Sequence, residues 1–248
     1  MNSSRILPRI KFGVYLFSTM YPDIPQPISH QPQLLVLEGS IGTVEIFPAI
    51  WKALEDLTKD DEATRASALE QIAELDAARI SPVVSYFLVT RIIEPNLELR
   101  ARVVEILSSV LTADHNGLPS PEDVRNSLRI YLAAIRTRQI YALLQVSAQF
   151  PQLESCITLL LSASSFGGNH LVDILEERKN PSDIRKQAAM MIGQVGYIYT
   201  LPALEKIAGR LEAHLSGQKS MNFINQSSSH ETELLPIVKD AINSLQSQ

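Results

Sequence analysis

The stretch NPSDIRKQAAMMIGQVG, residues 180–196, has the features of a helix with a defined start and a defined end. Asn180 can cap the free N–H groups of a first helical turn, and Pro181 suits the next position because the N–H that it lacks would have no partner there. Gly193 and Gly196 allow close packing or a left-handed stop at the far end. The stretch therefore predicts one helix that follows a polar turn.

The same pattern begins at Asp60, Asn96 and Ser120 as well. In each case a polar turn is followed by a helix in which an apolar or β-branched residue precedes an arginine. Apolar residues three and seven positions after each marker form one stripe on the helix. The markers are Arg65, Arg100, Arg125 and Arg185, and Leu153–Glu154 is a weaker member in the same register. Successive markers lie 25 to 35 residues apart, so each unit has room for about one helical hairpin.

Between the marker helices lie segments with apolar faces of their own, which we expect to be the first helices of the hairpins. A final helix is expected over residues 231–245, and little in the chain alternates as a strand would. The sequence thus predicts an all-α fold from residue 43 onward. The expected first helices cover residues 43–57, 81–93, 137–150, 169–179 and 201–215.

A helix, a short polar turn and a second helix that carries the arginine resemble the HEAT repeat. The match is best over residues 171–208 and second best over residues 51–75, and it extends over about residues 43–246. The first of these segments is also similar to the HEAT-like repeats of phycobilisome-linked lyases. The resemblance implies an armadillo-like α-solenoid, a right-handed superhelix of hairpins. Its motif residues are Leu175, Asn180, Pro181, Ile184, Arg185, Ala188, Gly193, Gly196, Pro202, Ala203 and Leu204.

The repeat domain, residues 43–248, departs from a regular array in two places. Too few residues separate the marker helices on either side of residues 112–120 for a first helix to fit, so we expect an irregular break there. Residues 216–230 are polar and are expected to form a loop before the last helix. The preceding residues 1–42 are expected to be a poorly ordered or extended leader with a proline-rich linker. The short apolar run FGVYLF leaves an export signal open as the alternative.

The repeated arginines have two interpretations. In HEAT repeats such a residue commonly pairs with an acidic residue in the turn and ties neighbouring units together, and contact with a ligand is the alternative. Separately, Arg125, Arg129 and Arg136 fall within about 40° of one another if a single helix contains all three. Such a stripe suits acidic side chains or phosphates. We therefore list these three residues as a candidate binding site for an acidic segment of a protein partner.

The composition and the motifs argue against several classes of function. A net charge of −5 argues against general nucleic-acid binding, which usually requires a basic surface. No apolar stretch reaches the ~20 residues of a membrane-spanning helix. The histidines show no HxxxH spacing of the kind that binds a metal, and His115 is expected to lie in a solvated turn. No catalytic motif is recognisable in the sequence. We expect no catalytic residue, no metal and no cofactor.

These observations favour a non-enzymatic scaffold or adaptor of the cytoplasm, which binds another protein through a curved helical surface. One alternative is a HEAT-like bilin lyase, which a spectral change with bilin and its acceptor subunit would reveal. A second is a HEAT-like DNA-repair protein, which a salt-dependent mobility shift with duplex DNA would reveal. Enzymatic activity therefore stays open at this point.

Overall fold

The computed structural model describes residues 43–114, 116–221 and 226–247. All of them belong to residues 42–248, the second of the two units into which the chain divides. The leader and linker expected for residues 1–42, and the turn expected at His115, lie outside the described residues. Side chains are described for residues 47–114, 116–216 and 230–247.

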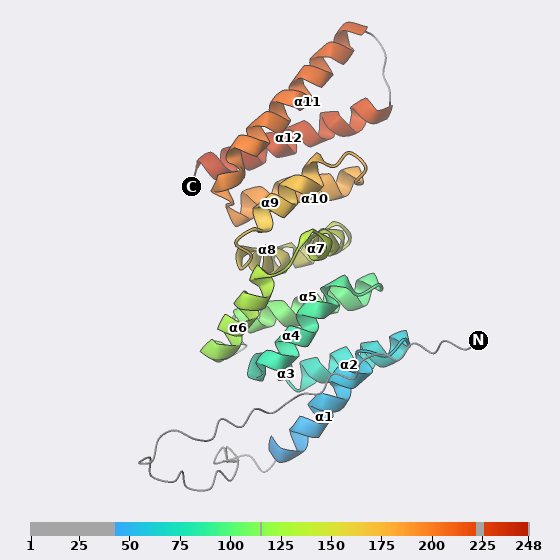
Figure 1. Ribbon diagram of the computed structural model, residues 1–248, viewed down its shortest axis with the longest axis vertical. Coiled ribbons are helices and arrows are strands. Elements are labelled where there is room, and N and C mark those ends of the chain that lie inside the picture. Colours follow the sequence, from blue (N-terminus) through green and yellow to red (C-terminus); the bar gives the residue numbers. More distant parts are fainter. Residues whose placement is uncertain (1–42, 115, 222–225, 248) are drawn as a thin grey trace, which may run out of the picture. The chain divides into compact units, whose positions relative to one another are not determined.

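The described part of the chain is all-α, as the sequence predicted, and the only β pairing in it is an isolated bridge between Ala113 and Pro119. Figure 1 shows the α-helices along the chain. They are α1 (Thr43–Asp56), α2 (Glu62–Glu74), α3 (Ala77–Ile80), α4 (Pro82–Thr90), α5 (Leu97–Leu111), α6 (Glu122–Ala133), α7 (Thr137–Gln149), α8 (Glu154–Ser162), α9 (Gly167–Glu176), α10 (Ser182–Val195), α11 (Leu201–Met221) and α12 (Gln226–Gln246). The 3-10 helices are η1 (Arg91–Ile93), η2 (Pro151–Leu153) and η3 (Ile198–Thr200).

Helices α2 and α5 each begin with a side-chain N-cap. The side chain of Asp61 accepts a hydrogen bond from the Thr64 N–H at 2.8 Å, and that of Asn96 accepts one from the Leu99 N–H at 3.0 Å. Each bond satisfies one of the N–H groups that a first helical turn leaves without an intrahelical partner.

The caps expected from Asn180 and Ser120 are wrong. The extended residues Pro181 and Pro121 occupy the cap positions, so α10 and α6 begin one residue later than the sequence suggested. The Asn180 side chain instead donates a hydrogen bond to the Ile174 carbonyl, at 2.9 Å. Ser120 is buried, and its hydroxyl has no hydrogen-bond partner among the described residues.

The second helices of the pairs pack against one another in chain order. Helix α2 contacts α5, α5 contacts α8, α8 contacts α10, and α10 contacts α12. Among the first helices, α7 contacts α9, and α9 contacts α11. The buried side chains of these helices, such as Leu107, Leu143 and Leu161, belong to one continuous hydrophobic cluster. Each pair therefore covers the apolar face of the next.

Helix α6 does not join the series of second helices, although its sequence resembles theirs. It packs mainly on α4 and contacts α5 less, so α8 is the helix that follows α5 in the series. Arg125 on α6 therefore does not share the packing environment of Arg65, Arg100 and Arg185, and its role as a repeat marker stays a prediction. The apolar stripe of α6 is buried in this position, with Val124, Leu128 and Leu132 among its buried residues.

Residues 112–114 and 116–121, where the sequence predicted a break, form no helix. Asp114 accepts hydrogen bonds from the N–H groups of Asn116 and Leu118, both at 2.8 Å. The buried Arg79 of α3 holds the same segment from the other side. Its guanidinium donates to the carbonyls of Ser109 and Thr112 at 2.5 and 3.0 Å, and to that of Leu118 at 2.8 Å.

The two glycines near the end of α10 have the roles that the sequence suggested. Gly196 adopts the left-handed conformation, with φ +82°, and ends the helix. Gly193 faces α12, where a Cβ atom would lie only 3.0 Å from the Cα of Ala241. The missing side chain therefore allows α10 and α12 to approach closely.

The polar segment 216–230 is more helical than expected. Helix α11 extends to Met221 and α12 begins at Gln226, and residues 222–225 lie outside the described residues. Its sequence has Gln, Lys and Met, which favour helices, and its one glycine is at position 217. Figure 1 shows α11 and α12 side by side.

Candidate functional site

The first marker arginine joins two neighbouring helix pairs. The Arg65 guanidinium lies 2.8 Å from the Glu94 carboxylate at the end of the next first helix, and both side chains are largely buried. The same guanidinium donates to the carbonyls of Lys59 and Asp60 in the turn before its own helix. Arg65 thus makes the acidic pairing between units that the sequence suggested.

The markers Arg100 and Arg185 bind mainly backbone carbonyls. Arg100 donates twice to the Glu94 carbonyl, at 2.9 and 2.6 Å, and once to the Gln145 side chain of α7, at 2.7 Å. Arg185 donates through Nε to the Leu175 carbonyl at 2.8 Å. Burial lowers the pKa of both guanidinium groups. These contacts tie turns to helices, so both residues have structural roles.

The proposed stripe of Arg125, Arg129 and Arg136 does not exist as predicted. Helix α6 ends at Ala133, and Arg136 is the N-cap of α7, where its backbone N–H donates to Gln139. Neither glycine nor proline marks the end of α6. Ile135, two residues after Ala133, is buried. Arg129 is exposed and donates to Asn126. Arg125 is half-buried, and its buried Nε has no hydrogen-bond partner in the described part of the chain. Binding of an acidic segment by these residues stays a prediction.

A different group of arginines lines a pocket where four helices meet. Arg178 follows α9, Arg185 is on α10, and Arg210 is on α11. We call this the arginine pocket. Its inner lining is completed by Glu176, Ile207, Leu211, His214 and Glu231, and the adjoining outer part by Asn180, Ser182 and His230.

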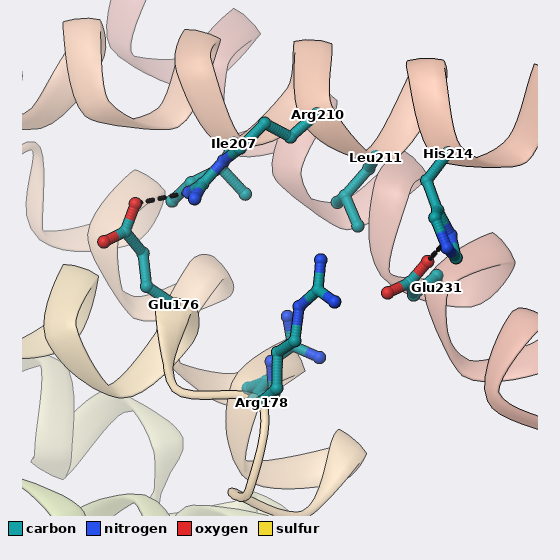
Figure 2. A pocket seen from close by; sticks show the side chains of 8 residues that line it. Glu176, Arg178, Ile207, Arg210, Leu211, His214 and Glu231 are labelled. Atoms are coloured by element: carbon teal, nitrogen blue, oxygen red, sulfur yellow. Dashed lines mark hydrogen bonds and ion pairs between the residues drawn. The ribbon is translucent and has the colours of Figure 1, made fainter.

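Two ion pairs form opposite walls of the arginine pocket (Figure 2). Arg210 of α11 pairs with Glu176 of α9. On the other side, His214 Nδ1 lies 2.5 Å from Glu231 Oε2 of α12. This buried Glu231 oxygen lies within ion-pair distance of the imidazole but meets no hydrogen-bond geometry. The Arg178 side chain rises between the two walls and points into the space that they enclose (Figure 2).

The side chains that line the pocket carry a net positive charge. Three arginines face two glutamates, so the lining carries an excess of positive charge even with both histidines neutral. Burial lowers the pKa of Arg185, the Glu231 carboxylate opposes that shift, and Arg178 adds to it. Among the described residues, Arg178 forms no hydrogen bond or ion pair. An anion is therefore the ligand that the pocket favours.

The pocket could not be found from sequence spacing. Arg178 and Arg185 flank the turn that the HEAT-like pattern covers, but Arg210, His214 and Glu231 come from helices that only the packing of α9 to α12 brings together. His214 and His230, which are scattered in the sequence, both line this pocket. The one available signal was the run of charged residues around the turn between α9 and α10.

The described residues contain neither a membrane-spanning helix nor a cluster of metal ligands. None of their helices has both the length and the apolar character needed to cross a bilayer. Nor do three or more His, Cys, Asp or Glu side chains among them gather in a way that could hold a metal ion.

The fold and the pocket define an all-α protein with an arginine-lined site between its C-terminal helix pairs. The chain matches no protein-family model, and comparisons with curated proteins and with solved structures gave no significant similarity.

Proposed function

We propose that residues 43–246 form an α-solenoid, a right-handed superhelix of HEAT-like hairpins. The ordered contacts from α2 to α12 support this proposal, because in a solenoid each repeat contacts its neighbours only. The Arg65–Glu94 pair supports it as well, since it joins one helix pair to the next. Such an array acts by presenting an extended surface to another molecule.

We infer that the protein is a non-enzymatic scaffold that binds another protein. The observation that carries this inference is a group of large apolar side chains left exposed on α3, α4, α6 and the segment between α5 and α6. We call this group the apolar surface. Its side chains are 50% to 68% exposed, and they are Ile80, Val83, Tyr86, Leu118 and Ile130.

Two contacts link the elements that carry these side chains. The Tyr86 ring packs edge-on against Tyr131 of α6, with ring centroids 5.2 Å apart. The Arg79 guanidinium, next to Ile80, donates to the carbonyl of Leu118. Exposed apolar side chains that gather in this way are typical of protein interaction sites.

The expected partner segment is an amphipathic helix with acidic residues beside its apolar face. Val83 and Tyr86 are three residues apart on α4, which places them on one face of that helix, and Ile80 is the last residue of the preceding α3. An amphipathic helix is a segment that docks on such an apolar face. Arg129 is exposed and directly precedes Ile130 on α6, which places a positive charge beside the apolar surface. This position retains the predicted preference for an acidic segment, although not as an arginine stripe.

The test is a site-specific cross-link followed by a binding measurement. A photoreactive amino acid in place of Tyr86 is used to capture partners from the native host, and the captured protein is purified. The double variant Ile80→Glu, Val83→Glu keeps the natural Tyr86. It is expected to bind the captured protein about tenfold more weakly or worse, because both substitutions place a charge in an apolar interface. Charge reversal in Arg129→Glu is expected to weaken this binding as well.

The matched control is Ile198→Glu, which changes an equally exposed isoleucine on η3. Unfolding curves of all variants show whether the fold is intact. Equal affinity of the natural chain, the double variant and Arg129→Glu for the captured protein would contradict binding through the apolar surface.

A further inference from the structure

The guanidinium of Arg178 lies where an anionic ligand could contact it. It stands between the Arg210–Glu176 and His214–Glu231 pairs, whose members already contact each other (Figure 2). Arg178 itself has no such partner among the described residues. A negative group between the two walls would therefore meet an available fork of N–H donors without having to break either ion pair.

Arg185 supplies a second guanidinium whose position is fixed. The residue is 9% exposed, and its Nε is held by the Leu175 carbonyl at 2.8 Å. A buried and anchored guanidinium loses little side-chain freedom when a ligand binds, and its field is poorly screened by solvent. The Glu231 carboxylate offsets part of the positive charge of Arg185 and also lies next to the His214 imidazole.

The outer part of the pocket adds donors of other kinds. Ser182, the first residue of α10, and His230 of α12 both line it. No side chain caps the N-terminus of α10, a helix of 14 residues. The N–H groups and the dipole of such a helix end favour a negative group. Arginine, imidazole, hydroxyl and helix end together offer more donors than one carboxylate can use.

The size of the pocket limits the ligand to a small group at the inner end. The inner part has a volume of about 40 Å³, and a single water molecule already needs ~10–15 Å³ on that measure. The adjoining outer part is wider, with a volume of about 260 Å³. A compact tetrahedral anion fits the inner end, and the remainder of a larger molecule would lie outside.

We propose that the arginine pocket binds a phosphate group, with Arg178 and Arg185 as its main ligands. The group is either free phosphate or the phosphate ester of a larger molecule. The site is separate from the apolar surface, so this proposal does not depend on the binding of a protein partner.

Titration calorimetry of the full chain with inorganic phosphate and with O-phosphoserine tests the proposal. Both probes are expected to bind saturably, and the tighter of the two identifies the source of the group. Arg178→Gln is expected to weaken binding about tenfold or more, because it removes a charged fork of donors. Arg178→Lys, which keeps the charge but not the fork, is expected to have an intermediate affinity.

Arg138→Gln is the matched control, since Arg138 is an exposed arginine on α7 outside the pocket; its affinity is expected to change less than about twofold. Arg178 is exposed, so its variants are expected to fold, and unfolding curves verify this. Three results would overturn the proposal: no saturable binding of either probe, unchanged affinity in Arg178→Gln, or equal affinity for acetate.

Discussion

Replacing Arg79 by methionine is expected to lower the free energy of unfolding by about 3 kcal/mol, because hydrogen bonds to charged groups contribute ~1.5–3 kcal/mol each and buried carbonyls would lose their donors. Arg79 is 7% exposed. Its guanidinium donates to three carbonyls, two of them on the residues that end α5 and one in the segment that leads to α6. Methionine retains the apolar stem but cannot donate to any of them.

The Arg79–Asp76 pair is not the source of this effect. Asp76 is 58% exposed, and exposed ion pairs contribute little to stability. Denaturant unfolding measures the change, with Arg138→Met as the control, for which less than about 0.5 kcal/mol is expected. Hydrogen exchange of residues 116–121 should rise in Arg79→Met at the same time. A loss below about 1 kcal/mol would show that the carbonyls find other partners.

Replacing Gly193 by valine is expected to lower the free energy of unfolding by about 2–3 kcal/mol, the usual range for overpacking a well-packed contact. The Cβ atom alone would lie 3.0 Å from the Ala241 Cα and 3.3 Å from its Cβ. The first of these is a backbone atom, which cannot rotate away. Valine would add two methyl groups at the same place, so α10 and α12 would have to separate.

Gly209 of α11 is the control for the intrinsic effect of a glycine in a helix. A Cβ atom at Gly209 would meet nothing within 4 Å. Gly209→Ala is therefore expected to raise stability by up to about 1 kcal/mol, since alanine favours the helix over glycine. If Gly193→Val were as stable as the natural chain in the same denaturant titration, close packing of α10 on α12 would be excluded.

Much of the helical structure could be predicted from the sequence because its signals are local. The apolar stripes predicted an all-α fold, the stop at Gly196 follows from its lack of a side chain, and Asp61 and Asn96 cap the helices that follow them. The pairing of Arg65 with an acidic residue was implied by the resemblance to HEAT repeats, and Glu94 provides it.

The remaining features depend on which helices pack together, and local signals do not encode that. The apolar stripe of α6 shows that the helix needs a neighbour but not which one, so its sequence could not reveal that it packs mainly on α4 and leaves the series of second helices. The end of α6 before Arg136 carries no glycine or proline and coincides with the burial of Ile135. The arginine pocket unites side chains from four helices for the same reason.

Hydrogen exchange of the Gly193→Val variant, measured helix by helix, tests the nearest-neighbour arrangement most directly. In an array where each helix pair contacts its neighbours only, a packing defect between α10 and α12 lowers the local stability mainly of the adjoining repeats. Protection is therefore expected to fall in α9 to α12 while α2 and α5 keep the protection of the natural chain. An equal loss of protection in all these helices would contradict the proposed solenoid.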